Sequence, residues 1–120
     1  MSLRILIVED DEDLRLALAD LLAFEGYAVD TAEDGQAGID LLRSGPRPEL
    51  VLLDMRMPRK SGHDVLETIR SAPALSGLPV VVMTAETTNP PAGAVAWLHK
   101  PVLPSLLLAV VSNYLRTRPK

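Results

Sequence analysis

Short runs of consecutive apolar residues restrict the fold of this chain more than any other feature of its sequence. Residues 3–8, 50–53 and 80–84 are mostly Leu, Ile, Val and Met, with no regular alternation of apolar and polar side chains. A strand with this composition is buried on both faces, as in a parallel sheet that carries helices on each side. Stretches with helical spacing of apolar residues lie between the runs. The sequence therefore predicts an α/β fold.

The remaining elements continue the same alternation of strand and helix. Further strands are expected at 27–32 and 94–99, and helices at 14–25, 36–44, 62–71 and 105–115. No internal repeat, low-complexity tract or linker interrupts the 120 residues. Residues 1–120 are therefore expected to form a single domain.

Charge and composition exclude several classes of protein. A net charge of -4 offers no basic face to a phosphate backbone, so direct nucleic-acid binding is not expected. Without cysteine, the chain has no disulfide, no thiolate metal site and no cysteine nucleophile. No apolar run approaches the roughly 20 residues that span a bilayer, and the N-terminus lacks a signal-peptide pattern. We therefore expect a soluble, cytoplasmic protein that does not associate with membranes.

Polar residues stand where the predicted strands end, which is where open parallel sheets bind their ligands. They comprise three acids, a hydroxyl and a lysine: Glu9, Asp10, Asp54, Thr84 and Lys100. Two close carboxylates repel each other by about 1 kcal/mol in water, and by more when they are desolvated. Mg²⁺ would remove this repulsion, since it binds one or two carboxylates together with a backbone carbonyl and water. This edge of the sheet is a candidate Mg²⁺ site.

Simpler roles are open for several of these residues. The acids at 11–13 are well explained as caps of the following helix, whereas Glu9 and Asp10 stand too early for that role. Asp54 is a candidate nucleophile that forms an acyl phosphate, with Lys100 and Thr84 contacting the phosphoryl group. A single Thr at a strand end is usually a turn residue, and a single Lys is usually solvated. Only the complete set points to phosphoryl transfer.

Four segments share a pattern known from one protein family. They are the first strand with its acids (5–11), the segment from Leu53 to Gly62 with its Pro58, the strand end 83–85, and the segment 93–101 that ends in Lys-Pro. Together they resemble the receiver domain of two-component response regulators, and the resemblance covers residues 3–116. Any one segment is a weak signal, but all four in this order in one short chain are a specific one.

The resemblance implies a role for each residue at the sheet edge. Glu9 and Asp10 would be the metal-site acids. Asp54 would be the phosphoacceptor, and it would share the metal with the backbone carbonyl of Arg56. Thr84 would be the switch hydroxyl, Lys100 the cation that contacts the phosphoryl group, and Trp97 falls on the switch-aromatic position. The peptide bond before Pro101 would be cis.

The resemblance also implies the architecture and the chemistry. It predicts a doubly wound, five-stranded parallel sheet in the order 2-1-3-4-5, as in flavodoxin-like receiver folds. Asp54 would take a phosphoryl group from a sensor histidine kinase or a phosphotransfer protein, with Mg²⁺. Water would then slowly hydrolyse the acyl phosphate and restore the Asp54 carboxylate. The domain would catalyse both steps itself without being a conventional enzyme. Phosphorylation would shift a conformational equilibrium and so change the affinity for a partner.

The sequence departs from the family pattern in the segment that should contain a fourth helix. Residues 85–92 are too few, by about one turn of helix or more, and include two prolines that cannot lie in a helix interior. We therefore predict that the fourth helix is absent or reduced to an irregular loop. The output surface that commonly includes this helix must then be remodelled.

Three further features leave alternatives open. Trp97 either switches rotamer or simply covers apolar surface left by the missing helix. The resemblance places Arg56 and Glu86 at the rim of the site, where they would hinder or orient the attacking water. Their opposite charges would pair across the entrance and slow dephosphorylation. The last helix has few polar positions around Leu108, so it either forms a homodimer or partner contact or packs more deeply in its own fold.

Two other classes of protein are alternatives to a phosphorylatable receiver. A pseudo-receiver, acting only as a protein-interaction module, is favoured weakly by the short segment 85–92 and opposed by the complete set of site residues. Enzymes on related folds fit poorly. A phosphatase of the haloacid-dehalogenase type would need Asp where Arg56 stands, and a flavodoxin-like phosphate loop would not contain the acids at 9–13.

Overall fold

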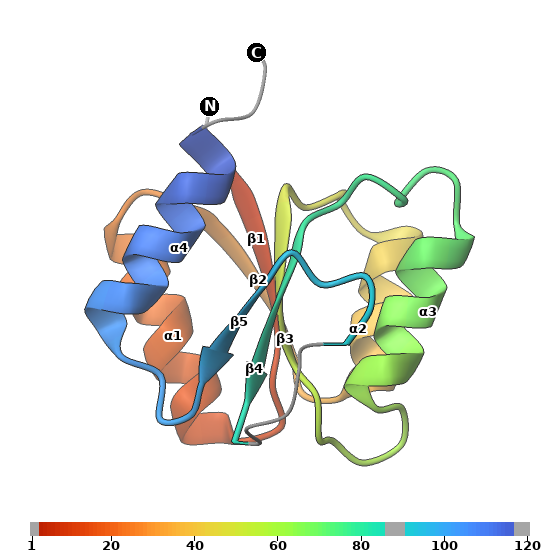
Figure 1. Ribbon diagram of the computed structural model, residues 1–120, viewed down its shortest axis with the longest axis horizontal. Helices are drawn as coiled ribbons and strands as arrows, with labels where there is room; N and C mark the ends of the chain where they lie inside the picture. The colour runs from red at the N-terminus through yellow and green to blue at the C-terminus, as the bar shows by residue number, and fades with distance from the viewer. Residues whose placement is uncertain (1–2, 86–90, 117–120) are drawn as a thin grey trace.

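The computed structural model describes residues 3–85 and 91–116, and these residues build a parallel sheet with helices on both faces (Figure 1). The five strands pair in parallel in the order β2-β1-β3-β4-β5. Their bounds are β1 Arg4–Val8, β2 Ala28–Ala32, β3 Leu50–Asp54, β4 Val80–Thr84 and β5 Ala96–His99. The predicted fold class and strand order are confirmed.

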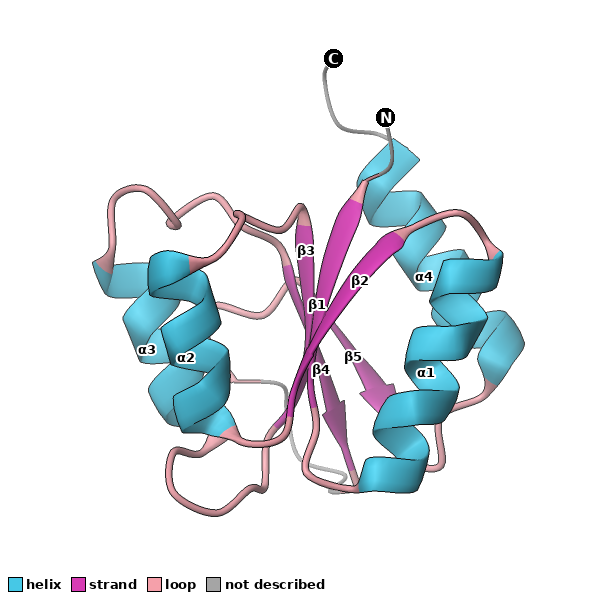
Figure 2. Ribbon diagram, turned by 180° about the vertical axis from the view of Figure 1, so that it is seen from behind, coloured by secondary structure: helices cyan, strands magenta, loops and turns pink. Residues whose placement is uncertain are grey.

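Helices cover the sheet in two pairs (Figure 2). Their bounds are α1 Glu12–Phe24, α2 Gly35–Ser44, α3 Gly62–Ser71 and α4 Pro104–Arg116. One face of the sheet packs against α1 and α4, and the other against α2 and α3. None of the helices in the described part of the chain is long and apolar enough to cross a bilayer.

Two apolar cores lie on either side of the sheet, which explains why the strand runs are continuous. Alternate residues of each strand face opposite cores, so that Ile5 and Ile7 join α1 and α4 while Leu6 and Val8 join α2 and α3. Every residue of β3 is buried. A central strand of this kind carries a polar side chain only at its end, which is Asp54.

Acids and a serine fix where three of the helices begin. Asp11 caps α1 by accepting a hydrogen bond from the Leu14 N–H at 3.1 Å, and Asp34 caps α2 by accepting one from Ala37 at 2.8 Å. Ser61 and Asp64 form a reciprocal capping box at the start of α3. The expected capping role of the acids after β1 is thus found at Asp11, which leaves Glu9 and Asp10 for the sheet edge.

The connection from β4 to β5 contains no helix within its described residues, 85 and 91–95, while 86–90 lie outside the residues described. Its second part contacts α3, since a Cβ on Gly93 would lie 2.8 Å from Cδ of Arg70. Ala94 packs against the core on the α2 and α3 side. The short connection therefore fills part of the space beside α3 with loop.

The last helix is only partly consistent with an all-round apolar surface. Leu107, Val111 and Leu115 form a buried stripe at a spacing of four residues. Leu103, just before α4, and Leu106 are 61% and 48% exposed. One face of α4 thus packs in its own fold, and Leu108 is partly buried against the same core, whereas Leu106 and the preceding Leu103 remain exposed.

Candidate acidic site at the carboxyl edge of the sheet

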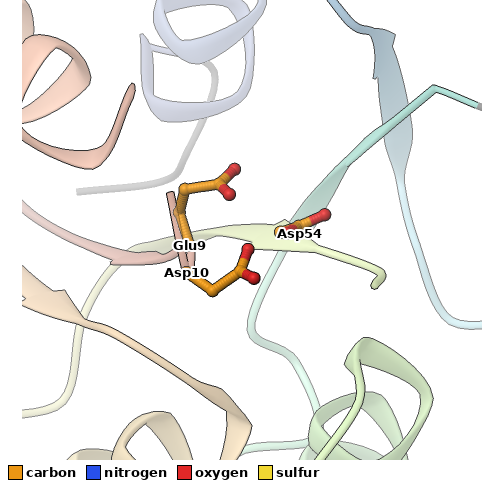
Figure 3. A group of neighbouring side chains, drawn as sticks. All are labelled: Glu9, Asp10 and Asp54. Atoms are coloured by element: carbon orange, nitrogen blue, oxygen red, sulfur yellow. The ribbon is translucent and has the colours of Figure 1, made fainter. Parts of the chain in front are cut away.

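Three carboxylates meet at the edge where β1 and β3 end (Figure 3). Glu9 and Asp10 follow β1, Asp54 ends β3, and one oxygen from each lies within 4.8 Å of the others. Glu9 is fully buried and Asp54 is 4% exposed, whereas Asp10 is exposed to solvent. The parallel pairing of the two strands brings together acids that are separated by more than 40 residues in the sequence.

Backbone hydrogen bonds hold Glu9 in place although it lies beyond the end of β1. Its N–H donates to the Ala32 carbonyl at 3.0 Å, which prolongs the pairing with β2. Its Oε2 accepts from the Asp11 N–H at 3.1 Å, and its carbonyl accepts from Nη1 of Arg15 at 3.0 Å. The Glu9 carboxylate is therefore fixed before any ligand arrives, which lowers the entropic cost of binding one.

Lys100 is the cation that faces these acids. It follows β5, and its N–H donates to the Thr84 carbonyl at 2.8 Å. Its Nζ lies 2.9 Å from Oε1 of Glu9 and 3.4 Å from Oδ1 of Asp54. Burial lowers the pKa of this ammonium, but attraction to Glu9 and Asp54 outweighs burial and holds its pKa above the ordinary value. The bond from Lys100 to Pro101 is cis, as the resemblance implied.

Asp54 has the most perturbed carboxyl group of the site. Burial, then repulsion from the Glu9 carboxylate, raise its pKa from 3.8 to about 7, although Lys100 opposes the shift. Among the described residues, the Lys100 ammonium pairs with Glu9 and Asp54, so the charges of the three carboxylates are only partly balanced. A perturbed acid of this kind at a sheet edge is a candidate for chemistry.

The donor set fits a hard divalent cation. All three side chains offer carboxylate oxygens, the ligands that Mg²⁺ prefers. Oε1 of Glu9 is buried and accepts no hydrogen bond of ordinary geometry, even though the Lys100 ammonium lies beside it. A divalent ion would offset the charge that this ammonium leaves unbalanced.

The remaining predicted site residues lie at different distances from this centre. The Arg56 N–H donates to Oδ1 of Asp54 at 3.2 Å, and its side chain is exposed. Thr84 ends β4 and is half-buried. Trp97 lies opposite Val82 in the register of β5, is 41% exposed, and has its ring 6.4 Å from that of His99. Glu86 lies outside the described residues, so its expected pairing with Arg56 is not seen.

Sequence reasoning missed two arginines near the site. Arg15 holds the Glu9 carbonyl, and Arg59 binds Asp34 beside the loop that follows β3. Arg15 follows Glu12 at helical spacing, which suggests only a surface pair, and such a pair is present at 3.8 Å. No local pattern links Arg59 to a partner 25 residues earlier.

Comparison with known protein families identifies the family of this chain. Residues 5–112 match the family model of the response regulator receiver domain. The chain belongs to this family. Phosphorylation of an aspartate, use of Mg²⁺ and interaction with histidine kinases or phosphotransfer proteins are general among receiver domains of two-component systems.

Known proteins similar to this receiver domain include a response regulator and isolated receiver structures. Response regulator MprA of Mycolicibacterium vanbaalenii is 39% identical over 97% of the chain. The chain spans about half of that relative's length, 52%. The chemotaxis protein CheY4 of Vibrio cholerae is 26% identical, with a TM-score of 0.88, over 95% of this chain and 99% of that one.

A more distant structure shows the fold alone. The receiver domain of the sensor histidine kinase PA1611 from Pseudomonas aeruginosa has a TM-score of 0.89 at 23% identity, over 98% of this chain and all of that one. That structure holds a magnesium ion in its active-site cleft. The fold is thus shared beyond clear sequence similarity.

The raised pKa of Asp54 predicts how the site affects stability. The native state holds the proton on Asp54 more tightly than the unfolded state, so the contribution of this residue is favourable below pH 4 and is lost as the pH rises through 7. Without divalent cations at pH 8, we expect Asp54→Asn to raise the free energy of unfolding by roughly 1–3 kcal/mol.

Urea unfolding between pH 4 and pH 8 measures this effect. The Asn variant should lose the downward slope of stability near pH 7 that the parent protein shows. Asp20→Asn, which removes an exposed carboxylate from α1, is the control and should change stability by less than about 0.5 kcal/mol. A variant at Asp54 that is less stable than the parent at pH 8 would contradict the charge repulsion described above.

Proposed function

We propose that Asp54 of this chain accepts a phosphoryl group from the phosphohistidine of a sensor histidine kinase or a phosphotransfer protein. The observation that carries this proposal is the position of the Asp54 carboxylate, which ends β3 between the Glu9–Asp10 pair and the Lys100 ammonium. The full set of residues that the family resemblance requires is present at one edge of the sheet. Residues 1–120 act in this proposal as one receiver domain.

The transfer step follows from these groups. A carboxylate oxygen of Asp54 forms a bond to phosphorus as the bond from phosphorus to the imidazole nitrogen of the donor breaks. The electron pair stays on the imidazole, which takes up a proton from solvent. Asp54 must be deprotonated to attack. Its pKa of about 7 already includes the effect of Lys100, so a bound cation would be needed to favour the charged form further.

Glu9, Asp10, Asp54 and the backbone carbonyl of Arg56 would hold the magnesium ion. When bound, Mg²⁺ neutralises negative charge on the phosphoryl oxygens. Lys100 already reaches both Glu9 and Asp54, and its ammonium can exchange one of these carboxylates for a phosphoryl oxygen. The Thr84 hydroxyl, at the end of the neighbouring strand, donates a hydrogen bond to the phosphoryl group in this proposal.

A change of partner affinity is the proposed output. Thr84 and Lys100 are joined by a backbone hydrogen bond, so movement of Thr84 toward a phosphoryl group is transmitted to β5. Trp97 lies on β5 and is partly exposed, so its environment reports that movement. Arg56 and Glu86 are proposed to flank the site and to affect the rate at which water hydrolyses the acyl phosphate.

The alternative is a pseudo-receiver that binds partners without being phosphorylated. The lack of a helix in the described part of the β4–β5 connection favours it, because a remodelled output surface need not respond to phosphorylation. The complete acidic site opposes it, since a module that does not need the chemistry gains nothing from three repelling carboxylates. By analogy with its family, we propose that the domain works in the cytoplasm and does not contact nucleic acid directly.

Phosphorylation is tested by incubating the protein with Mg²⁺ and a small-molecule phosphodonor and measuring its intact mass. We expect one phosphoryl adduct, lost in Asp54→Asn and blocked by EDTA. Trp97 is the only tryptophan, so its fluorescence should change with formation of the adduct in the same sample. A correctly folded protein that forms no adduct with any donor would favour the pseudo-receiver.

We also propose that α4 forms a contact between two copies of the domain. Leu103 and Leu106 are the large exposed apolar residues of this region, and burying the exposed part of each in an interface is worth about 1 kcal/mol. Sedimentation equilibrium should show association that Leu106→Lys weakens at least tenfold. Ala17→Lys, on the exposed surface of α1, serves as the control. A parent protein that stays monomeric at high concentration would exclude the contact.

A further inference from the structure

Asp34 and Arg59 join two elements that the proposed chemistry does not use. Asp34 is 3% exposed and caps α2, and its Oδ1 accepts from the Ala37 N–H at 2.8 Å. Its other oxygen, Oδ2, accepts from Nε of Arg59 at 2.9 Å and also contacts Nη2 of the same guanidinium. The cap and the arginine together lower the pKa of Asp34, with the Ala37 N–H as the larger cause. One carboxylate thus binds a helix and a loop at once.

The loop reached by Arg59 is the one that follows Asp54. It runs from Met55 to Ser61, between β3 and α3. Arg59 has a φ of +58°, a conformation that costs free energy in a residue other than glycine and that persists where surrounding contacts enforce it. The backbone of the loop also touches α2, because a Cβ on Gly35 would lie 1.8 Å from the Lys60 carbonyl oxygen. The two segments are in direct contact.

The first half of this loop carries the Arg56 backbone, whose N–H donates to Oδ1 of Asp54. The loop is closed at its far end by the Gly62 N–H, which donates to the Met55 carbonyl at 3.2 Å. Met55 and Met57 pack against the core on the α2 and α3 side, while 58–60 are exposed. Arg59 is therefore the side chain that ties the exposed part of the loop to a helix.

We propose that Asp34 and Arg59 are positioning residues for the cation and phosphoryl site, because their ion pair fixes the loop that presents the Arg56 carbonyl. This inference rests on the proposed function and adds residues to it that touch neither the metal nor Asp54. The pair holds the loop to α2 in the geometry that aligns Arg56 with the acids. When the pair is broken, the loop samples other geometries and the cation binds less tightly.

Electrostatics alone predicts the opposite change in Mg²⁺ affinity, so the experiment can distinguish the two explanations. Arg59 is a cation near an acidic site, so its removal would strengthen the binding of another cation if charge were all that mattered. A loss of Mg²⁺ affinity on removing Arg59 therefore reports positioning. Lys60, the next residue and also exposed, supplies a control for the loss of one positive charge in the same loop.

The experiment compares Arg59→Asn, Arg59→Lys and Lys60→Gln with the parent protein. Asn tolerates the left-handed backbone that Arg59 adopts, so the first variant removes the guanidinium without adding strain. Amide hydrogen exchange of 55–61 is measured without Mg²⁺, and the Kd for Mg²⁺ is measured by calorimetry. Thermal unfolding checks that each variant is folded.

We expect Arg59→Asn to speed exchange in 55–61 and to raise the Kd for Mg²⁺ about 3- to 10-fold, as changes behind metal ligands do. Arg59→Lys should recover part of both effects, and Lys60→Gln should show neither. A Kd for Arg59→Asn that is unchanged or lower would overturn the inference, as would an equal loss in Lys60→Gln. If the parent protein binds no Mg²⁺, the proposed function fails, and unchanged exchange in Arg59→Asn would then overturn the positioning role separately.

Discussion

Repulsion among the carboxylates at the end of β1 and β3 is the constraint on which the site depends. The strands fix Glu9 and Asp54 through their backbones, so the acids cannot move apart to relieve their charge. Lys100 offsets part of it, but burial together with repulsion from Glu9 still raises the pKa of Asp54. The excess negative charge of these carboxylates favours binding of a proton or of a divalent cation, and a carboxylate that accepts a phosphoryl group needs the cation.

Lys100 lies at this edge because it follows β5, which a short connection joins to β4. The Val95 N–H donates to the Val80 carbonyl at 2.9 Å, and the Val95 carbonyl accepts from the Tyr114 hydroxyl at 2.8 Å. These bonds tie the start of β5 to β4 and to α4. The strand thus keeps its register, and Lys100 its place, although the described part of the connection contains no helix. The described part of the connection lies beside α3 as loop, and the acidic edge is intact.

The fold was predictable because the central strands β1, β3 and β4, which are buried on both faces, are continuous apolar runs in the sequence. Runs such as 50–53 identify central parallel strands, and a residue like Asp54 that ends such a run must lie at the sheet edge. The gathering of Glu9, Asp10 and Asp54 then follows from strand order, which came from the family resemblance. The contacts of Arg15 and Arg59 could not be predicted, because each depends on how a helix or loop packs against a distant segment. The amount of exposed apolar surface on α4 likewise depended on how the helix is rotated.

Calorimetric titration with Mg²⁺ in buffers of different ionisation enthalpy tests the central claim most directly, because it counts the protons released when the cation binds. Asp54 is mostly protonated at pH 6 and mostly charged at pH 8, given its pKa of about 7. Binding at pH 6 should therefore release close to one proton, and binding at pH 8 should release few. Equal proton release at both pH values, or no Mg²⁺ binding by the folded protein, would contradict the view that charge at this edge is balanced by a divalent cation.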